Sequence, residues 1–197
     1  MLTHCGTQKI ETDRLILRQF QYSDDENMLE YWISDPNIQF MYSEPIYSTK
    51  NEVKELLDKY INSYQNCDYY RWAVIEKKSQ ICIGQIAFFL VNTQNHFGEI
   101  EYCIGSKFQR NGYMTEAVKA IVDYGFNDMN LHKVQVCHKE NNEASKGVIQ
   151  KCKFKYEGTL RDFFYMNGKY VSRLYYSILR EEWENEKSFQ DRNTLEE

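Results

Sequence analysis

The sequence predicts an α+β protein in which helices cover one mixed sheet. Segments with strand and helix periodicity follow the order β-α-α-β-β-β-α-β-α-β-β, and consecutive hairpins followed by βαβ units imply a mixed sheet. The 197 residues include only 2 Pro and 9 Gly, which favours long elements with short connections. They also include 16 Tyr and 11 Phe, a density of aromatic side chains that favours strands and cavity walls. The length favours a single domain.

One strand and two helices are expected in the first third of the chain. The β-rich run at residues 14–20 predicts the first strand. The spacing Ser/Thr-x-x-Glu, which lets a side chain cap a helix start, begins at Ser23 and again at Thr49. We expect the helix after Ser23 to end before Pro36, because proline disfavours helical geometry in the residue ahead of it. Residues 53–64 carry apolar side chains at helical spacing and predict the clearest amphipathic helix of the chain.

The remaining elements follow from changes in the apolar period. The pattern predicts strands at 70–76, 81–90 and 98–104, a helix at 115–128, a strand at 132–138, a helix from 141 to about 152, and strands at 154–161 and 170–179. Asn167-Gly168 is a strong turn signal between the last two strands. The tail at 184–197 is highly polar, and we expect it to fray.

Charge and hydropathy exclude several classes of protein. The chain has 24 Lys+Arg against 29 Asp+Glu, a net charge of −5, which argues against a protein that grips nucleic-acid phosphates. An acidic surface mildly favours cationic substrates such as amines. The sequence has no apolar run of about 18 residues and no secretory signal, so we expect a cytoplasmic protein without a membrane partner.

The cysteines do not have the spacing of a metal site. Six are present, but no pair has the spacing CxxC and none clusters with histidines as zinc ligands do. Cys82, Cys103 and Cys137 lie inside apolar runs, where reduced cysteine behaves as a small hydrophobe. We therefore expect a reduced protein with no metal.

The connection from strand 98–104 into the next helix is the most informative segment. Residues 109–114 place Gly112 directly before the helix. Converging backbone N–H groups, the positive end of the helix dipole and the close approach that glycine permits together favour an anion site. Arg110 adds a positive charge suited to phosphate oxygens. The segment has neither the Walker sequence GKS/GKT nor the pattern GxGxxG.

From about Thr12 to Trp183 the chain resembles the GNAT superfamily of acyl-CoA-dependent N-acetyltransferases. Within it the chain is most similar to the branch that includes the acetyltransferases of ribosomal-protein N-termini. The likeness rests on several motifs in the right order: ETDRLILRQF, QRNGYMTEAVKAIVDYGFNDMNLHKVQ, NNEASKGVIQKCKF and NGKYVSRLYYSILREEW. It implies one acetyltransferase domain over 1–197, with a central mixed, mostly antiparallel sheet of about seven strands flanked by about four helices.

The resemblance also implies how acetyl-CoA binds. The family's pyrophosphate loop has the pattern Gln/Arg-x-x-Gly-x-Gly/Ala, and here Met114 replaces the last small residue. The loop N–H groups would hold the pyrophosphate, and the end of strand 98–104 would pair with the pantetheine arm. The residues implied to bind CoA are Tyr102, Cys103, Ile104, Gln109, Arg110, Asn111, Gly112, Tyr113, Met114, Thr115 and Asn142.

Acetyl transfer to an amine needs a base, a donor to the thioester oxygen and help for the departing thiolate. Glu99 is the candidate base, directly or through a water, and matches a frequent acid of the branch. Glu101 lies two residues on, hence on the same face, and can share the role. Either carboxylate can equally be a solvated strand residue. The resemblance implies a main-chain N–H near Cys103 as the oxyanion donor.

The general acid is less well defined by sequence. Many members of the family use a tyrosine in the helix before the last hairpin, but Ile149 or Gln150 occupies that point here. Ser145, in the branch's N-x-x-S motif, is the alternative proton donor, although its hydroxyl can instead bond local backbone. Lys153 also replaces the family's usual glycine before Phe154.

The resemblance thus implies an acetyl-CoA-dependent N-acetyltransferase, and we expect it to act by direct attack on a primary amine. No Cys or Ser is placed as an acylated nucleophile, so a ternary complex is expected. The acceptor stays open between a protein N-terminal amine and a small molecule such as a polyamine, an antibiotic or an amino acid. A non-catalytic acyl-CoA-binding module is the rival from another class. We expect a monomer or homodimer.

Overall fold

A computed structural model describes residues 2–194, with side chains up to residue 188. Eight strands form one sheet in the order β1-β2-β3-β4-β5-β6-β8-β7. Only β5 and β6 are parallel among these neighbours, which confirms the expected mixed, mostly antiparallel sheet. The strands are β1 Ile10–Glu11, β2 Leu15–Arg18, β3 Tyr70–Glu76, β4 Cys82–Asn92, β5 Phe97–Ile104, β6 Lys133–Lys139, β7 Lys155–Met166 and β8 Lys169–Leu179.

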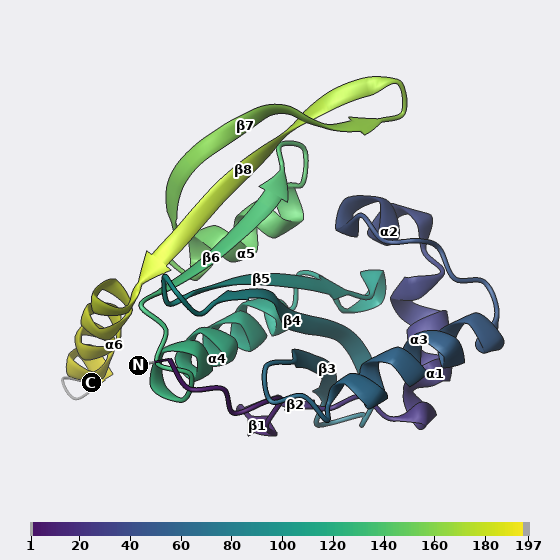
Figure 1. Ribbon diagram of the computed structural model, residues 1–197, viewed down its shortest axis with the longest axis horizontal. Helices are drawn as coiled ribbons and strands as arrows, with labels where there is room; N and C mark the ends of the chain where they lie inside the picture. Colours follow the sequence, from purple (N-terminus) through teal and green to yellow (C-terminus); the bar gives the residue numbers. More distant parts are fainter. Residues whose placement is uncertain (1, 195–197) are drawn as a thin grey trace.

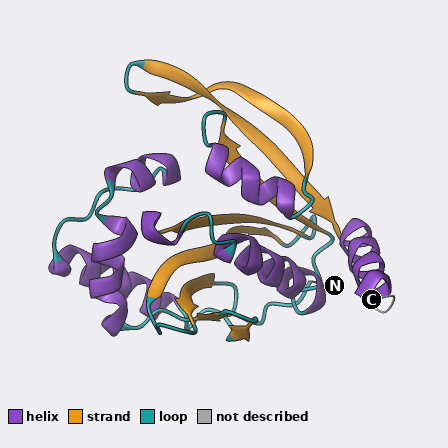
Figure 2. Ribbon diagram, turned by 180° about the vertical axis from the view of Figure 1, so that it is seen from behind, coloured by secondary structure: helices purple, strands orange, loops and turns teal. Residues whose placement is uncertain are grey.

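Helices cover both faces of the sheet (Figures 1 and 2). The helices are α1 Asp25–Met28, α2 Pro36–Tyr42, α3 Lys50–Ser63, α4 Tyr113–Asn127, α5 Glu143–Lys151 and α6 Arg180–Thr194. One core contains buried residues of α4, α5 and α6, and a second core contains residues of α1, α2 and α3. The sheet thus separates two helical layers, and the long β7–β8 hairpin extends beyond them (Figure 1).

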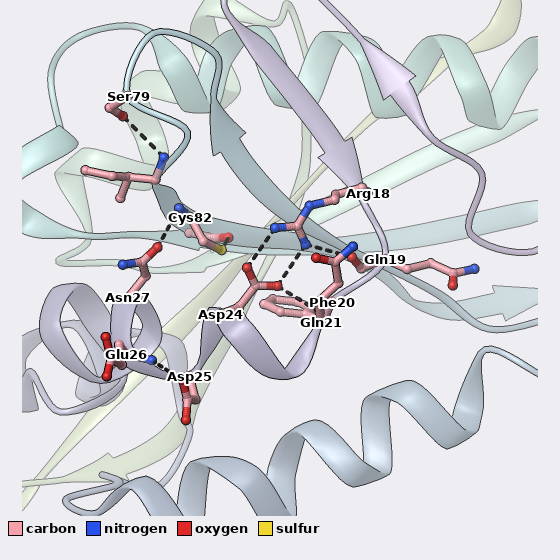
Figure 3. A network of polar contacts seen from close by, with 12 residues as sticks. Arg18, Gln19, Phe20, Gln21, Asp24, Asp25, Glu26, Asn27, Ser79 and Cys82 are labelled. Carbon is pink, nitrogen blue, oxygen red and sulfur yellow. Dashed lines mark hydrogen bonds and ion pairs between the residues drawn. The ribbon is translucent and has the colours of Figure 1, made fainter.

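A buried ion pair fastens the turn that leads into α1 to β2, the second strand of the sheet (Figure 3). Arg18 at the end of β2 donates from Nη1 and Nη2 to the two carboxylate oxygens of Asp24, at 2.8 and 2.7 Å. Asp24 is buried, and its Oδ2 also accepts from the Gln21 N–H at 2.8 Å. The Asn27 side chain accepts from the Cys82 N–H at 3.1 Å, which ties the same helix to β4.

The structure confirms one of the two expected helix caps. Thr49 accepts from the Glu52 N–H, and Glu52 accepts from the Thr49 N–H, so α3 begins with the expected capping box. The cap expected at Ser23 is wrong, because Gln21 and Asp24 form the capping box two residues earlier in the chain.

Two helices were not expected from the sequence. Pro36 does not only end the preceding helix; it opens α2 at the first helical position, where the missing N–H has no partner to lose. Asp35 caps this helix by accepting from the Asn37 N–H at 2.9 Å. The tail expected to fray forms α6 through Thr194, and residues 195–197 lie outside the described residues. Trp183 holds α6 in place, since its indole donates to Asp123 at 2.7 Å.

The sheet opens between β5 and β6. Their parallel pairing runs from Phe97↔Lys133 to Ile100↔Val136 and stops there. Beyond this point β5 continues to Ile104 and β6 to Lys139. On the other side of β5, a bulge in β4 shifts the register between Phe88 and Leu90. We call the diverging ends of β5 and β6, residues 101–104 and 137–139, the splay.

Candidate functional site

Backbone groups of β5 face into the splay. The Gly105 N–H donates to the Ile83 carbonyl at 2.9 Å, on the β4 side. The His96 carbonyl accepts from the His132 N–H at 2.7 Å, on the β6 side. Because hydrogen-bonding groups alternate along a strand, the N–H and C=O of Tyr102 and Ile104 point away from β4 and into the splay. These groups are suited to pair with an extended arm of a ligand.

The loop before α4 needs glycine at position 112. Gly112 has φ +80°, in the left-handed region, and a Cβ there would lie 3.4 Å from Nη2 of Arg14. Arg110 also has a positive φ of 63°. Asn111 donates from its side chain to the Phe108 and Gln109 carbonyls at 3.2 and 3.1 Å, which closes the loop on itself. The result is a tight turn into the start of a 15-residue helix.

The N-terminus of α4 has no side-chain cap among the described residues. Thr49 and Asn142 do cap α3 and α5. The first-turn N–H groups of Tyr113, Met114 and Thr115 therefore have no intrahelical acceptor, and the helix dipole adds positive potential at this point. An uncapped start of a long helix behind a glycine turn fits a phosphate-bearing ligand.

Arg14, the residue directly before β2, supports this loop. Its Nη1 donates to the Asn111 carbonyl at 2.9 Å, and its Nε donates to Glu116 at 2.7 Å. Thr12 donates to the same carboxylate at 2.6 Å. Burial raises the pKa of Glu116, but the hydrogen bonds from Thr12 and Arg14 outweigh it and lower the pKa overall. The Arg14 guanidinium thus offsets the one acidic residue in the first turn of α4.

Tyr102 and Ser145 meet across the splay. Tyr102 lies on the face of β5 that packs against the α4 core, and its hydroxyl is 2.9 Å from Oγ of Ser145. Ser145 lies in the first turn of α5, where its N–H donates to the Asn142 side chain at 3.1 Å. The Ser145 hydroxyl therefore contacts a side chain from β5, and Asn142 acts as the helix cap.

Glu99 is buried, with 4% of the residue exposed, and both its oxygens are bonded. Arg173 of β8 donates to Oε1 at 2.7 Å, and Gln135 of β6 donates to Oε2 at 2.8 Å. Arg173 also donates from Nε to Sγ of Cys137 at 3.0 Å. This cluster lies beside the last paired rung of β5 and β6, at the vertex of the splay.

Glu101 has a more open environment. Arg71 of β3 and Tyr42 of α2 both donate to its Oε1, at 2.6 and 2.7 Å. Among the contacts of the described residues Oε2 has no partner, and 23% of the side chain is exposed. Arg71 also donates to Gln85 at 2.9 Å and lies over the ring of Tyr60. The carboxylate is thus held from one side and open on the other.

Lys139 joins the end of β6 to α2. Its ammonium donates to the Phe40 and Met41 carbonyls, the latter at 3.1 Å, and lies 5.0 Å from the ring centre of Phe164. The residue is buried, and burial lowers the pKa of Lys139 to about 8. The contact brings α2, β6 and β7 together on the same face of the sheet as Glu101.

The structure brings the sequence-predicted residues into two groups on opposite faces of β5. The loop 109–115, Tyr102 and Ser145 lie toward α4 and α5, whereas Glu99, Cys103 and Glu101 lie toward the α1–α3 layer. Sequence reasoning missed Arg14, Arg71 and Arg173, each of which contacts a site carboxylate. For Arg14 the motif ETDRLILRQF was a signal; the other two have no local pattern.

The remaining predictions concern the cysteines, a metal site and a membrane span. Cys82 and Cys103 are buried as expected, whereas Cys137 is half-buried beside Arg173. The structure pairs none of the six cysteines. Among the described side chains of residues 2–188, no group of three or more His, Cys, Asp or Glu is placed to hold a metal ion. No helix in this range is long and apolar enough to cross a bilayer.

Comparison with known proteins identifies relatives over most of the chain. Residues 14–155 match the family described as "Acetyltransferase (GNAT) domain". The uncharacterized N-acetyltransferase YnaD of Bacillus subtilis (strain 168) is 32% identical over 178 residues, 88% of this chain and 98% of YnaD. Spermidine N(1)-acetyltransferase of Vibrio cholerae is 27% identical over 155 residues, 78% of this chain and 82% of that protein. Ribosomal-protein-S5-alanine acetyltransferase from Vibrio fischeri has the same fold, with a TM-score of 0.76, 22% identity and coverage of 89% of this chain and 98% of that one.

Proposed function

Since the chain belongs to the GNAT family and is therefore an acetyl-CoA-dependent N-acetyltransferase, we propose that it acetylates a primary amine by direct attack in a ternary complex. One observation carries this proposal: the splay lies between an uncapped helix start on one face of the sheet and a half-open carboxylate on the other. The CoA part of acetyl-CoA would thus lie on the α4 face, with its thioester in the splay. An amine would reach that thioester from the α2 face.

The α4 face supplies the CoA contacts. The N–H groups of Tyr113, Met114 and Thr115 hold the pyrophosphate, and the backbone of Tyr102 and Ile104 pairs with the pantetheine arm. A splay N–H also donates to the thioester oxygen as negative charge develops there. By the alternation of the strand this donor is Tyr102 or Ile104, because the Cys103 N–H points toward β4.

Glu101 is the general base in this proposal, and Glu99 is the alternative. A base must offer a lone pair to the attacking amine or to a bridging water. Glu101 has an oxygen without a partner among the described contacts, while Arg173 and Gln135 use both oxygens of Glu99. Arg71 and Tyr42 hold the other oxygen of Glu101 in place, which leaves the open oxygen directed away from them.

Charge near Glu101 favours a small cationic acceptor. Burial and the nearby Glu101 carboxylate raise the pKa of Glu44, so two acids lie close together on this face. Tyr42, Tyr47 and Tyr60 line the same layer, and tyrosine faces attract ammonium groups. The similarity to a spermidine acetyltransferase agrees with an acceptor that carries more than one positive charge.

A protein N-terminus is the second candidate acceptor, and the β7–β8 hairpin favours it. Phe163, Tyr165 and Tyr170 are exposed, at 48%, 69% and 63%. Exposed aromatic side chains supply contact area for a polypeptide. Phe164 of the same hairpin lies against Lys139, on the Glu101 face.

Turnover against a panel of amines tests the proposal. The panel contains spermidine, an aminoglycoside, free amino acids, and peptides that begin with Ser, Ala or Met. We expect amine-dependent release of CoA thiol, and one product heavier by a single acetyl group in mass spectrometry. CoA release that is the same with and without every amine would contradict the function, and binding without any turnover would favour the acyl-CoA-binding module.

A further inference from the structure

We propose that Tyr102 positions the Ser145 hydroxyl so that it donates a hydrogen bond to the sulfur that leaves the thioester. This inference rests on the proposed function, because it assigns roles at the same site. It concerns how the thiolate departs. No tyrosine that could assist this step stands at any of the nine positions of α5. Instead, the phenol of Tyr102 on β5 reaches the start of α5.

The geometry places this pair across the path of the ligand. Tyr102 lies two residues beyond Ile100, the last β5 residue that pairs with β6. Its backbone faces the splay while its ring packs toward α4, and its hydroxyl spans the opening to the first turn of α5. A thioester sulfur bound along the backbone of Tyr102 would therefore lie beside the Ser145 hydroxyl.

Ser145 is held from two sides. Its N–H donates to Asn142, which fixes the backbone of the helix start. The Tyr102 hydroxyl lies 2.9 Å from Oγ and 3.3 Å from the Ser145 carbonyl, so the contact with Oγ is the shorter. When the phenol donates to Oγ, the serine hydrogen is free to point at a third atom. A leaving sulfur is the acceptor that the reaction places there.

The pair donates hydrogen bonds and does not give up a proton. Burial raises the pKa of Tyr102 above its ordinary value, which keeps the phenol protonated. A thiol is acidic enough to leave as a thiolate without needing that proton. As the amine nitrogen bonds to the carbonyl carbon, the C–S bond breaks and its electron pair stays on sulfur. The proton of the amine goes to Glu101, and the thiolate takes its own proton from water after release.

Titration of the CoA thiol on the enzyme tests this chain of donors without any acceptor. Thiolate absorbance against pH gives the thiol pKa of CoA bound to the wild type, Tyr102→Phe, Ser145→Ala and the double variant. A donor to the thiolate lowers that pKa, so Tyr102→Phe should raise it by about one unit, and Ser145→Ala by at least as much. The double variant should match Ser145→Ala, since Tyr102 acts only through Ser145.

Turnover provides the second readout. With a verified amine, Tyr102→Phe should lower kcat about tenfold when it is made in the wild-type protein. Made in the Ser145→Ala variant, it should leave kcat unchanged. Ser145→Thr, which keeps a hydroxyl, should restore most of the activity. Tyr124→Phe is the matched control, because this buried phenol donates to the Gly6 carbonyl far from the splay. It should affect the thermal midpoint, and neither kcat nor the thiol pKa.

Two results would overturn the inference: a thiol pKa unchanged by Tyr102→Phe, or a kcat loss of the same size with and without Ser145. Both quantities can be measured on any variant that binds CoA. If Tyr102→Phe does not fold, Ser145→Ala still tests the inference, because that substitution alone must raise the thiol pKa. Failure of the proposed function is a separate outcome. In that case no amine is acetylated, yet the thiol pKa still responds to both substitutions.

Discussion

Replacing Glu99 and Glu101 separately by Gln should separate stability from chemistry. The two acids lie two residues apart on one face of β5, but their surroundings differ. Glu99 is buried between Arg173 and Gln135 with both oxygens bonded. Glu101 keeps one oxygen without a partner among the described contacts, and its side chain is 23% exposed. We expect Glu99→Gln to weaken the fold and Glu101→Gln to weaken catalysis.

The magnitudes follow from these contacts. Glu99→Gln leaves the Arg173 guanidinium without its counter-charge, and breaking a buried pair in this way costs about 3 kcal/mol when hydrogen bonds partly survive. For a chain of this length that lowers the thermal midpoint by about 6–12 °C. Glu101→Gln should cost less, because Arg71 keeps Gln85 and the Tyr60 ring. Its kcat should fall about 10²–10⁴-fold, the usual effect of losing a general base.

Thermal unfolding and kcat between pH 6 and 9 measure both effects on the same preparations. The loss in Glu101→Gln should shrink at high pH, where more of the amine is already unprotonated. Glu99→Gln should keep kcat within about tenfold of the wild type at temperatures where it is folded. The opposite pattern, with normal turnover in Glu101→Gln and a large pH-dependent loss in Glu99→Gln, would refute the assignment of the base.

Three further changes test other parts of the structure. Gly112→Val should abolish acetyl-CoA binding in calorimetry, because φ of +80° is unfavourable for a β-branched residue at the pyrophosphate loop; unchanged affinity would place the site elsewhere. Asp24→Asn should lower the free energy of unfolding by about 2–3 kcal/mol in urea, because Arg18 loses its bidentate partner; a loss near zero would mean that water screens the pair. Lys139 has a pKa lowered to about 8, so the unfolded chain binds more protons than the folded one above that pH, and stability relative to Lys139→Met should rise from pH 8 to 10. A flat difference would show that Lys139 titrates normally.

The turn at Gly112 and the helix start that follows it were predictable because their signals are local. Gln109, Gly112 and the start of α4 are contiguous, so a strand, a glycine turn and an uncapped helix can be read from one segment of sequence. The same holds for the cap at Thr49 and the turn at Asn167-Gly168, each of which depends on a few adjacent residues. Boundaries shifted by only a few residues where the period of the apolar side chains was clear.

The surroundings of Glu99 and Glu101 were not predictable because their contacts join distant segments. Arg71 meets Glu101 across 30 residues, and Arg173 meets Glu99 across 74. No spacing rule relates such pairs. Pro36 illustrates a different failure, since a proline that ends one helix can also begin another, and the choice depends on Asp35 capping the new helix. Tyr42 reaches Glu101 only because α2 forms.

The ion pair at the vertex of the splay provides a last test of what Glu99 does. A buried ion pair is weak evidence for stability, because apolar residues of similar size often stabilise a fold equally well. Glu99, Gln135 and Arg173 nevertheless join β5, β6 and β8 at the point where β5 and β6 separate. We therefore expect the double variant Glu99→Leu with Arg173→Leu to recover most of the stability that Glu99→Gln loses. If the polar cluster sets the position of the splay, KM for acetyl-CoA should rise in the double variant while the thermal midpoint stays near that of the wild type. A double variant with wild-type stability and wild-type KM would mean that the β4 bulge and the helices on either face hold β5 and β6 apart without this cluster.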